Sequence, residues 1–402
     1  MKILIIGHFG GRNLGDELIL YSQMKGLSEL FKKNDIEFVI YTYDENFTKK
    51  IYSKYGFNIT TVKALNTRNF FSSLKEQYKK IKNIDLAVLG GGGLIQDIYF
   101  SYGVVRYLVP LYISLLRNVP LYSLSLGVYH IENFLNKILF KNFLKYANGI
   151  SVRDKSSLLN IKKICPNIEV FKIPDSVFLL KNDKQIKNDK SEQNELTVIL
   201  REFFSNSIET IAEMVKYIFY DKKIRKINLI IFENSDIEKK LVFNLEKTLK
   251  KKGVSSIEIF NNLDPLQYLR IINSSKLIIS GRLHGILPAF IFKKSTICLS
   301  YAPKIDSFCT ENKLRFIRIE ELNDLDIKKI DEYIMRKDIS VNLNKYLEFL
   351  NKIRNTLTKK PKISLYRKVY IIFLLTISLF YLFGKHILIV LLKRNNKISK
   401  EN

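Results

Sequence analysis

The fold is decided by the stretch Leu277-Ile278-Ile279-Ser280-Gly281-Arg282-Leu283-His284-Gly285. Its apolar start predicts a buried strand, and its small and polar end predicts the loop where an open α/β sheet binds ligands. Arg282 offers a planar fork of donors for a carboxylate or phosphate, and an imidazole such as that of His284 can transfer protons near neutral pH. The pair predicts an anionic substrate and acid/base chemistry, with an ordinary strand-to-helix loop as the alternative.

Short apolar runs recur on both sides of this stretch and alternate with segments of helix length. This rhythm is typical of parallel strands joined by helices. The runs are residues 3–6, 37–41, 86–89, 121–126, 149–152, 196–200, 227–232, 256–260, 277–279 and 296–299. Residues 181–194 carry almost no apolar side chain, which predicts a polar linker. We therefore expect an α/β protein with two doubly wound Rossmann-like domains, residues 1–180 and 195–357, that face a central cleft.

Length and composition agree with this organisation. A chain of 402 residues exceeds the usual size of a single core, so two domains are expected. Its 66 Lys and Arg residues against 39 Asp and Glu residues leave a formal net charge of +27, which favours anionic partners. No aromatic-basic module indicates nucleic acid. The three cysteines, Cys165, Cys298 and Cys309, show neither a C-x-x-C pair nor metal-ligand spacing, so no metal site is predicted.

A first glycine-rich loop, residues 7–17, follows the first apolar run and reads G-H-F-G-G-R-N-L-G-D-E. Glycines let the backbone approach a ligand closely, and the helix that follows presents N–H groups suited to anions. Phe9 stands at the second glycine position of the dinucleotide motif, and no Walker lysine is present, so NAD is not predicted. Asn13 and Asp16 are candidate substrate contacts, with a helix cap as the alternative.

A second glycine-rich loop, residues 90–97, reads G-G-G-G-L-I-Q-D. Four glycines at the end of a buried strand are costly in entropy, so a close ligand explains them better than packing alone. Two further arginines, Arg153 and Arg201, follow apolar runs as Arg282 does. Three such arginines favour an anionic ligand, although a surface ion pair is the alternative for Arg153.

The tail, residues 358–402, differs in kind from the rest of the chain. Residues 369–384 carry no charge, Lys385-His386 interrupts, and residues 387–392 are apolar again. A spanning helix needs about 20 apolar residues, so the uninterrupted run is short. Basic residues flank it at Lys359, Lys360, Lys362, Arg367 and Lys368 before and at Lys393, Arg394, Lys397 and Lys400 after. We expect a hydrophobic C-terminal helix that associates with an anionic membrane, with packing on the protein as the alternative.

Taken together, these motifs resemble the polysaccharide pyruvyl transferase family over residues 3–310. The resemblance rests on the order of the blocks Gly10–Glu17, Gly90–Asp97, Ser125-Leu126-Gly127, Val152-Arg153-Asp154 with Ser156-Ser157, Pro174-Asp175, Arg201, Ser280–Gly285, and Tyr301 with Lys304. The chain departs from the family pattern at Lys293-Lys294-Ser295-Thr296, where a glycine is expected.

The resemblance implies transfer of a pyruvyl group from phosphoenolpyruvate onto a sugar as a ketal, on a fold similar to the two-domain GT-B glycosyltransferases. It implies that Arg153 and Arg282 bind phosphoenolpyruvate and that His284 is the catalytic histidine. Further substrate-binding residues are expected at Arg201, Leu283, Asn13, Asp16, Gly91, Gly92, Gly93, Asp97 and Lys304. Phosphoenolpyruvate is the donor substrate, and neither a cofactor nor a metal is implied.

The expected partners are phosphoenolpyruvate, a sugar acceptor of a surface polysaccharide or of its lipid-linked precursor, and an anionic membrane surface, without nucleic acid. Residues 1–6 are too short for a signal peptide, so the catalytic part is expected at the cytoplasmic face of the cell membrane, held peripherally or by its C-terminal end. Lipid-linked oligosaccharides are built at that face.

Two other functions are open. A glycosyltransferase of the same fold would use a nucleotide sugar and would call for a ribose-binding carboxylate in the second domain. Arg153 and Arg282 in one pocket would instead favour a compact dianion. The non-enzymatic alternative is a basic protein that binds membrane surfaces or nucleic acid, and the absence of an aromatic-basic module argues against nucleic acid.

Overall fold

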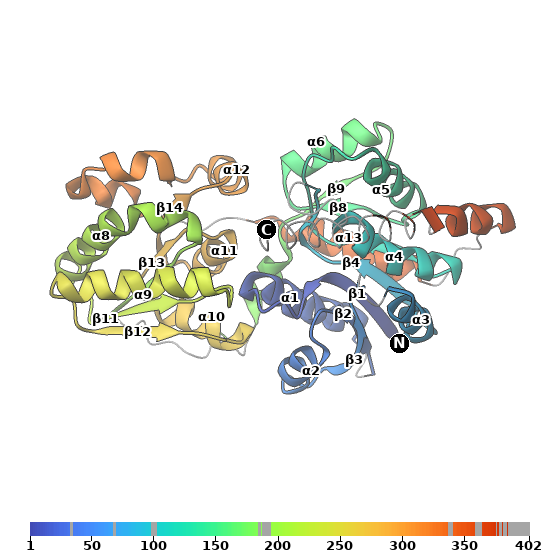
Figure 1. Ribbon diagram of the computed structural model, residues 1–402, viewed down its shortest axis with the longest axis horizontal. Helices are drawn as coiled ribbons and strands as arrows, with labels where there is room; N and C mark the ends of the chain where they lie inside the picture. Colours follow the sequence, from blue (N-terminus) through green and yellow to red (C-terminus); the bar gives the residue numbers. More distant parts are fainter. Residues whose placement is uncertain are drawn as a thin grey trace, which may run out of the picture. The chain divides into compact units, whose positions relative to one another are not determined.

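The computed structural model describes the chain except for residues 33–34, 67–69, 98–102, 184–185, 187–193, 337–340, 358–363, 375, 378–379, 381–383 and 385–402. The chain forms two compact units, each drawn with its strands and helices in Figure 1. The first unit consists of Met1–Gly11, Gly26–Asp175 and Asn344–Asn402, and the second of Arg12–Lys25 and Ser176–Leu343. Both units contain parallel sheets with helices, as the alternation of apolar runs predicts.

Two parallel sheets build the first unit. The five-stranded sheet has the order β3 (Asn58–Lys63), β2 (Glu37–Thr42), β1 (Lys2–Phe9), β4 (Leu86–Leu89) and β6 (Leu121–Ser123). The four-stranded sheet has the order β5 (Gly92–Ile95), β7 (Leu126–Val128), β8 (Ser151–Val152) and β9 (Phe171–Lys172). The helices are α2 (Glu45–Ser53), α3 (Phe70–Lys80), α4 (Gly103–Leu116), α5 (Phe134–Tyr146), α6 (Lys155–Ile164) and α13 (Leu343–Thr356). Ile3 of β1 lies between Phe38 and Leu86, so continuous apolar strands fill the middle of the larger sheet.

A single six-stranded sheet builds the second unit. Its order is β12 (Ile257–Phe260), β11 (Lys226–Ile230), β10 (Glu195–Ile199), β13 (Leu277–Ser280), β14 (Ser295–Ser300) and β15 (Ile317–Arg318). The α-helices are α8 (Ile208–Asp221), α9 (Asp236–Lys251), α10 (Pro265–Ser274), α11 (Leu283–Ile291) and α12 (Pro303–Glu311), with short 3-10 helices η1 (Ser176–Asn182), η2 (Glu202–Ser207), η3 (Ile319–Asp324) and η4 (Ile327–Tyr333). After α11, Lys293 has a φ of 57°, the left-handed region that glycine favours, so the glycine of the family pattern would suit this turn.

The structure corrects two predicted elements. Residues 121–126 form two strands in different sheets, because Ser125 takes a φ of 52° and its hydroxyl donates to the Pro174 carbonyl at 2.6 Å. Gly92 and Gly93 do not lie in a loop but begin strand β5, which pairs with β7. A positive φ of 88° at Gly92 gives a local reason for glycine there.

The two units divide the chain differently from the expected domains. Helix α13 was expected in the second domain, yet the Phe349 ring lies 5.2 Å from Phe171 and 6.1 Å from Tyr122, so α13 packs on the first unit. Helix α1 (Leu14–Phe31) is shared, because its residues up to Lys25 belong to the second unit. The predicted linker lies mostly outside the described residues.

The described residues of the tail from 365 to 384 are helical (Figure 1, red), with 375, 378–379 and 381–383 outside the described residues. Ile371 and Leu374 are buried in the core of the first unit, which is the packed arrangement given above as the alternative. Among the described residues, no helix combines the length and apolar character that crossing a membrane requires. The interruption at Lys385-His386 and the flanks 358–363 and 393–400 lie outside the described residues.

Candidate functional site

The turn from β13 to α11 places Arg282 and His284 at the carboxyl end of a central strand. The Ser280 hydroxyl accepts from the Arg282 N–H at 3.1 Å and donates to the Arg282 carbonyl at 3.0 Å. A Cβ atom at Gly285 would lie 2.2 Å from Ser280 Oγ, and one at Gly281 would lie 2.4 Å from the Phe204 ring. Packing against Ser280 of the same turn explains Gly285, and packing against the Phe204 ring explains Gly281. Leu283 is buried as well.

Arg282 is buried and pairs with carboxylates of the same unit. Its Nη2 lies 2.6 Å from Glu238 Oε2, its Nη1 lies 3.4 Å from Glu233 Oε2, and its Nε donates to the Leu200 carbonyl at 3.2 Å. Glu238 also accepts from the backbone N–H groups of Phe232 and Glu233 at 2.7 and 3.0 Å. Burial raises the pKa of Glu238 despite the attraction of Arg282. The Arg282 guanidinium therefore connects Glu233 and Glu238, before and within α9, to the Leu200 carbonyl after β10.

Arg201, at the end of β10, reaches the same group of side chains. Its Nη1 donates to Tyr301 Oη at 2.9 Å, and its guanidinium lies 5.6 Å from the ring centres of both Phe203 and Tyr301. Burial alone would lower the pKa of Arg201, but Tyr301 and the carboxylates of Glu202 and Glu233 raise it, so the group stays charged. Glu233 Oε2 lies 4.0 Å from Arg201 Nη2 and therefore bridges Arg201 and Arg282.

Lys304 adds a further cation beside Arg201. Its Nζ lies 5.8 Å from the centre of the Tyr301 ring, the ring that also carries the hydroxyl bonded to Arg201. Glu233 thus links Arg201 with Arg282, and Tyr301 links Arg201 with Lys304, at the strand ends of the second unit.

The first glycine-rich loop contributes its second half to this site. The Leu14 N–H donates to the Phe232 carbonyl at 3.0 Å, and Asn13 pairs with Glu233 as an antiparallel bridge. Asn13 Oδ1 accepts from the Gly15 N–H at 3.0 Å, so Asn13 caps α1 as the alternative predicted. Asp16 lies in the first turn of the same helix.

Gly15 lies directly against the His284 imidazole. A Cβ atom at Gly15 would lie 2.6 Å from His284 Nδ1 and 3.1 Å from His284 Cβ. The contact joins two motifs that lie far apart in the sequence, and it explains why a glycine stands between Leu14 and Asp16. The position of the imidazole depends on this close approach.

Replacing Gly15 with alanine should lower turnover by about tenfold to a hundredfold, because the whole His284 side chain must move and small misplacements are costly in catalysis. Steady-state kinetics measures the effect, and the melting temperature should change little. Gly384→Ala is the matched control, since a Cβ there would meet nothing within 4 Å. Unchanged turnover in Gly15→Ala would mean that the position of His284 does not matter for the reaction.

Arg153 belongs to the first unit, at the end of β8. Its side chain is buried, with Nε 3.2 Å from Asp154 Oδ2 and Nη1 3.5 Å from Asp175 Oδ2. Burial alone would lower the pKa of Arg153, but Tyr129 and the two carboxylates raise it. Asp154 also caps α6 by accepting from the Ser157 N–H at 2.7 Å. The ion pair offered above as the alternative for Arg153 is therefore present, but inside the unit.

The glycines of the second loop and Asp97 make contacts within the first unit. A Cβ at Gly93 would lie 2.6 Å from the Tyr129 ring, so Gly93 makes room for that ring. Asp97 accepts from the backbone N–H groups of Glu132 and Asn133 at 3.1 and 2.8 Å, which holds the start of α5. Substrate contact by Gly91, Gly92, Gly93 and Asp97 stays a prediction.

Sequence reasoning missed a polar network around His8 in the first unit. A register shift between Ile6 and Phe9 interrupts the pairing of β1 with β2, and His8, which lies within it, is exposed. His8 Nδ1 lies 2.9 Å from Tyr107 Oη, which lies 3.4 Å from Tyr43 Oη. Arg106 Nη1 donates to Tyr43 Oη at 3.1 Å. The only sequence signal was a histidine within the glycine-rich loop.

The predicted site residues therefore fall into two groups. The second unit holds Asn13, Asp16, Arg201, Arg282, Leu283, His284 and Lys304, and the first holds Gly91, Gly92, Gly93, Asp97 and Arg153. In the part of the chain that the structure describes, no group of three or more His, Cys, Asp or Glu could hold a metal ion.

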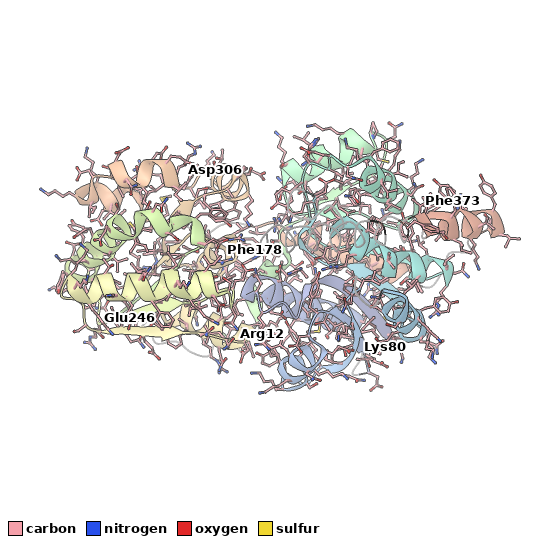
Figure 2. All side chains as sticks on the ribbon, in the orientation of Figure 1. Arg12, Lys80, Phe178, Glu246, Asp306 and Phe373 are labelled. Carbon is pink, nitrogen blue, oxygen red and sulfur yellow. The ribbon has the colours of Figure 1, made fainter. Side chains whose placement is uncertain are left out.

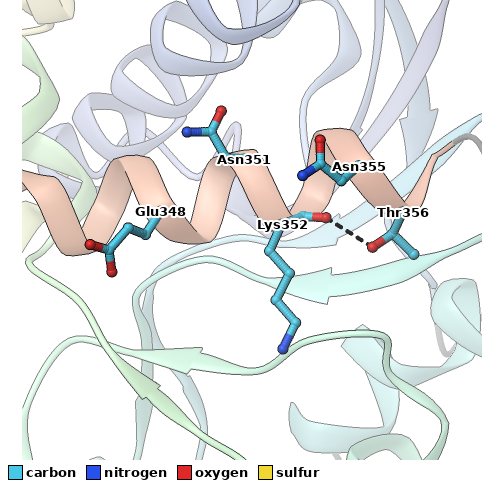
Figure 3. A pocket seen from close by; sticks show the side chains of 5 residues that line it. All are labelled: Glu348, Asn351, Lys352, Asn355 and Thr356. Atoms are coloured by element: carbon cyan, nitrogen blue, oxygen red, sulfur yellow. Dashed lines mark hydrogen bonds between the residues drawn. The ribbon is translucent and has the colours of Figure 1, made fainter.

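A hollow of about 540 Å³ lies elsewhere, along α13 (Figure 3). Its lining comes from one helix face, at Glu348, Asn351, Lys352, Asn355 and Thr356. Lys352 pairs with Glu169 at 2.7 Å, so its charge is already matched. The hollow contains none of the predicted site residues.

A family model described as polysaccharide pyruvyl transferase matches residues 13–303, which include the turn at Arg282 and His284. The chain belongs to this family. The match begins at Asn13, the residue that caps α1 in the second unit, and ends just before Lys304. No curated protein sequence gives a significant match.

The fold of this family member is similar to that of two solved structures. The S. aureus MnaA structure with UDP has a TM-score of 0.58 and 11% identity, and the match covers 90% of this chain and 99% of that chain. The UDP-GlcNAc 2-epimerase of Methanocaldococcus jannaschii has a TM-score of 0.57 and 14% identity, with 88% of this chain and 100% of that chain covered. At such identities the likeness shows the fold alone. It confirms the predicted α/β fold with parallel sheets, of the GT-B type.

Proposed function

We propose that this polysaccharide pyruvyl transferase moves the pyruvyl group of phosphoenolpyruvate onto two hydroxyls of one sugar as a cyclic ketal, without a cofactor. The observation that carries the proposal lies at the strand ends of the second unit, where Arg201 and Arg282 share Glu233 and Lys304 lies beside Tyr301. His284 follows Arg282 by two positions in the same turn. Cations at this edge suit a donor with a carboxylate and a phosphate. The family supports pyruvyl transfer as the reaction.

The chemistry balances with one proton-transfer group and no redox step. Each of two sugar hydroxyls forms a C–O bond to the central carbon of phosphoenolpyruvate, and the bond from that carbon to the phosphate oxygen breaks. One hydroxyl proton goes to the methylene carbon, which becomes a methyl group, and the other leaves with inorganic phosphate. His284 is proposed to carry the proton to carbon or from a hydroxyl, and the arginines to neutralise the departing phosphate.

Binding of the donor requires a rearrangement in the second unit. Glu233 lies 3.4 Å from Arg282 and 4.0 Å from Arg201, where an anionic donor would bring a like charge. We propose that the donor displaces the Glu233 carboxylate while Glu238, fully buried, keeps its pair with Arg282. Glu233 is partly exposed, so its side chain has room to turn toward solvent.

A glycosyltransferase that uses a nucleotide sugar is the second candidate, and Glu233 is the observation that favours it. This alternative requires a carboxylate in the second unit that binds the ribose. Glu233 is a carboxylate at the strand ends of the second unit, beside Arg201 and Arg282. The solved structures named above include one with UDP.

One assay separates the candidates. The full chain is incubated with phosphoenolpyruvate and a panel of free and lipid-linked sugars, and phosphate release and product mass are followed. Release of phosphate together with a ketal product, unaffected by a chelator, is expected. Transfer from a uridine or guanosine diphosphate sugar, with phosphoenolpyruvate inert, would replace this proposal by the second candidate.

We also propose that the protein works at the cytoplasmic face of the cell membrane on a lipid-linked sugar. The apolar tail and its basic surroundings support this location. Separation of membranes from cytosol tests it, since the full chain should remain with the membranes until detergent is added.

A further inference from the structure

The described tail helix has a second apolar face that the core does not cover. Ile371 and Leu374 face the first unit, whereas six large apolar side chains on the remaining surface are between 52% and 82% exposed. These are Leu365, Tyr366, Val369, Ile372, Phe373 and Phe380, here called the outer tail face. Their spacing of mostly three and four residues puts them along one side of the helix.

One side of the tail helix packs against the first unit. Burial raises the pKa of Tyr112 in α4 and of Tyr146 in α5, and Tyr370 of the tail adds to both shifts. Tyr370 thus lies close to both helices, in agreement with the burial of Ile371 and Leu374. Figure 2 shows Phe373 on the tail helix at the edge of the first unit. A helix fixed along its side cannot also be surrounded by lipid.

The charged residues that flank the outer tail face in the sequence are all basic. No acidic residue occurs between Glu348 and Glu401, whereas Arg367 and Lys368 lie on the helix itself. Lys145 is exposed in the last turn of α5, next to Tyr146. Basic residues beside an exposed apolar stripe complement an anionic lipid surface.

We propose that the outer tail face lies flat on an anionic lipid bilayer and holds the first unit directly against it. The apolar side chains enter the boundary between headgroups and acyl chains, and the basic side chains stay among the headgroups. This inference deepens the membrane location proposed above, because it names the surface, the side chains and the depth.

Vesicle binding by the full chain tests the proposal without donor or acceptor, so its outcome is separate from that of the transfer reaction. The protein should bind vesicles of equal parts phosphatidylglycerol and phosphatidylcholine, and added salt should weaken the binding. The triple variant Val369→Gln, Ile372→Gln, Phe373→Gln should bind about tenfold more weakly or worse. Ile237→Gln with Phe243→Gln, two exposed apolar residues of α9, is the matched control and should bind as the unchanged protein does.

Depth is measured by fluorescence, because the chain contains no tryptophan. Tryptophan in the variant Phe373→Trp should shift to shorter wavelength on vesicles and be quenched best by lipids brominated near the headgroup. Phe243→Trp should show neither change. Quenching that is strongest from the ends of the acyl chains would mean that the helix spans, and would overturn the proposal.

Two further outcomes would also overturn it. One is equal vesicle binding by the triple variant and the control pair. The other is a concentration-dependent dimer that the triple variant abolishes, together with no vesicle binding by the unchanged protein, since the outer tail face would then bind a second copy of the chain. The mutated side chains are exposed, so melting temperatures should stay unchanged in all variants.

Discussion

His284→Ala should lower turnover by about 10²- to 10⁴-fold, the range that general acid–base groups contribute. Phosphoenolpyruvate binding should change by only about twofold, because the cations of Arg201, Arg282 and Lys304 stay in place. Steady-state kinetics gives the turnover, and calorimetric titration gives the donor affinity. The loss should therefore appear in kcat rather than in donor binding.

His130→Ala is the control for this variant, because His130 is an exposed histidine outside the motif. It should keep full activity. If His284→Ala also kept nearly full activity, the proton-transfer role would pass to the network of His8, Tyr107 and Tyr43 in the first unit. His8→Ala would then be the variant that loses turnover.

Glu238→Ala should destabilise the second unit by about 3–5 kcal/mol, because it leaves the buried Arg282 without its closest charge partner. The backbone N–H groups of Phe232 and Glu233 lose their acceptor as well. The loss in the free energy of unfolding is measured from the midpoint of urea unfolding, with amide exchange in the second unit as the signal. The two units need not unfold together, so a whole-chain signal is not used.

Glu246→Ala on the same helix is the matched control. Figure 2 labels Glu246 on α9. Glu246 pairs with Lys250 at 2.8 Å in an exposed i,i+4 bridge, which should be worth about 0.5 kcal/mol or less. The double variant Glu238→Met with Arg282→Met should recover much of the stability, since apolar side chains remove both buried charges. Equal effects of Glu238→Ala and Glu246→Ala would contradict a structural role for the buried pair.

Much of the fold could be predicted because parallel strands buried on both faces are continuous apolar runs. Residues 3–6, 86–89 and 277–279 therefore point to β1, β4 and β13 directly. The break at Ser125 could not be predicted, because a left-handed serine held by the Pro174 carbonyl depends on a contact between distant residues. Placing α13 on the first unit likewise needed the rings of Tyr122 and Phe171.

The sequence predicted which residues form the site, but it predicted only some of the contacts that these residues make. The turn at Ser280–Gly285 has a local signature, so its place at a strand end followed from the sequence. The carboxylates that pair with Arg282 could not be predicted from the sequence, because Glu233 and Glu238 are 49 and 44 positions away along the chain. The sequence predicted that Gly15 would face a ligand. In the structure, Gly15 instead leaves room for the side chain of His284.

The assignment of Arg12–Lys25 to the second unit has a consequence for the order of folding. The Tyr21 hydroxyl donates to Asp183 at 3.2 Å and the Gln23 amide donates to Ser176 at 3.2 Å, across 162 and 153 positions of sequence. A segment that leaves the ribosome among the first residues must therefore wait for partners made much later, and contacts of such separation slow folding. We expect the second unit to reach its native packing only after synthesis has passed Leu343, the last residue of that unit.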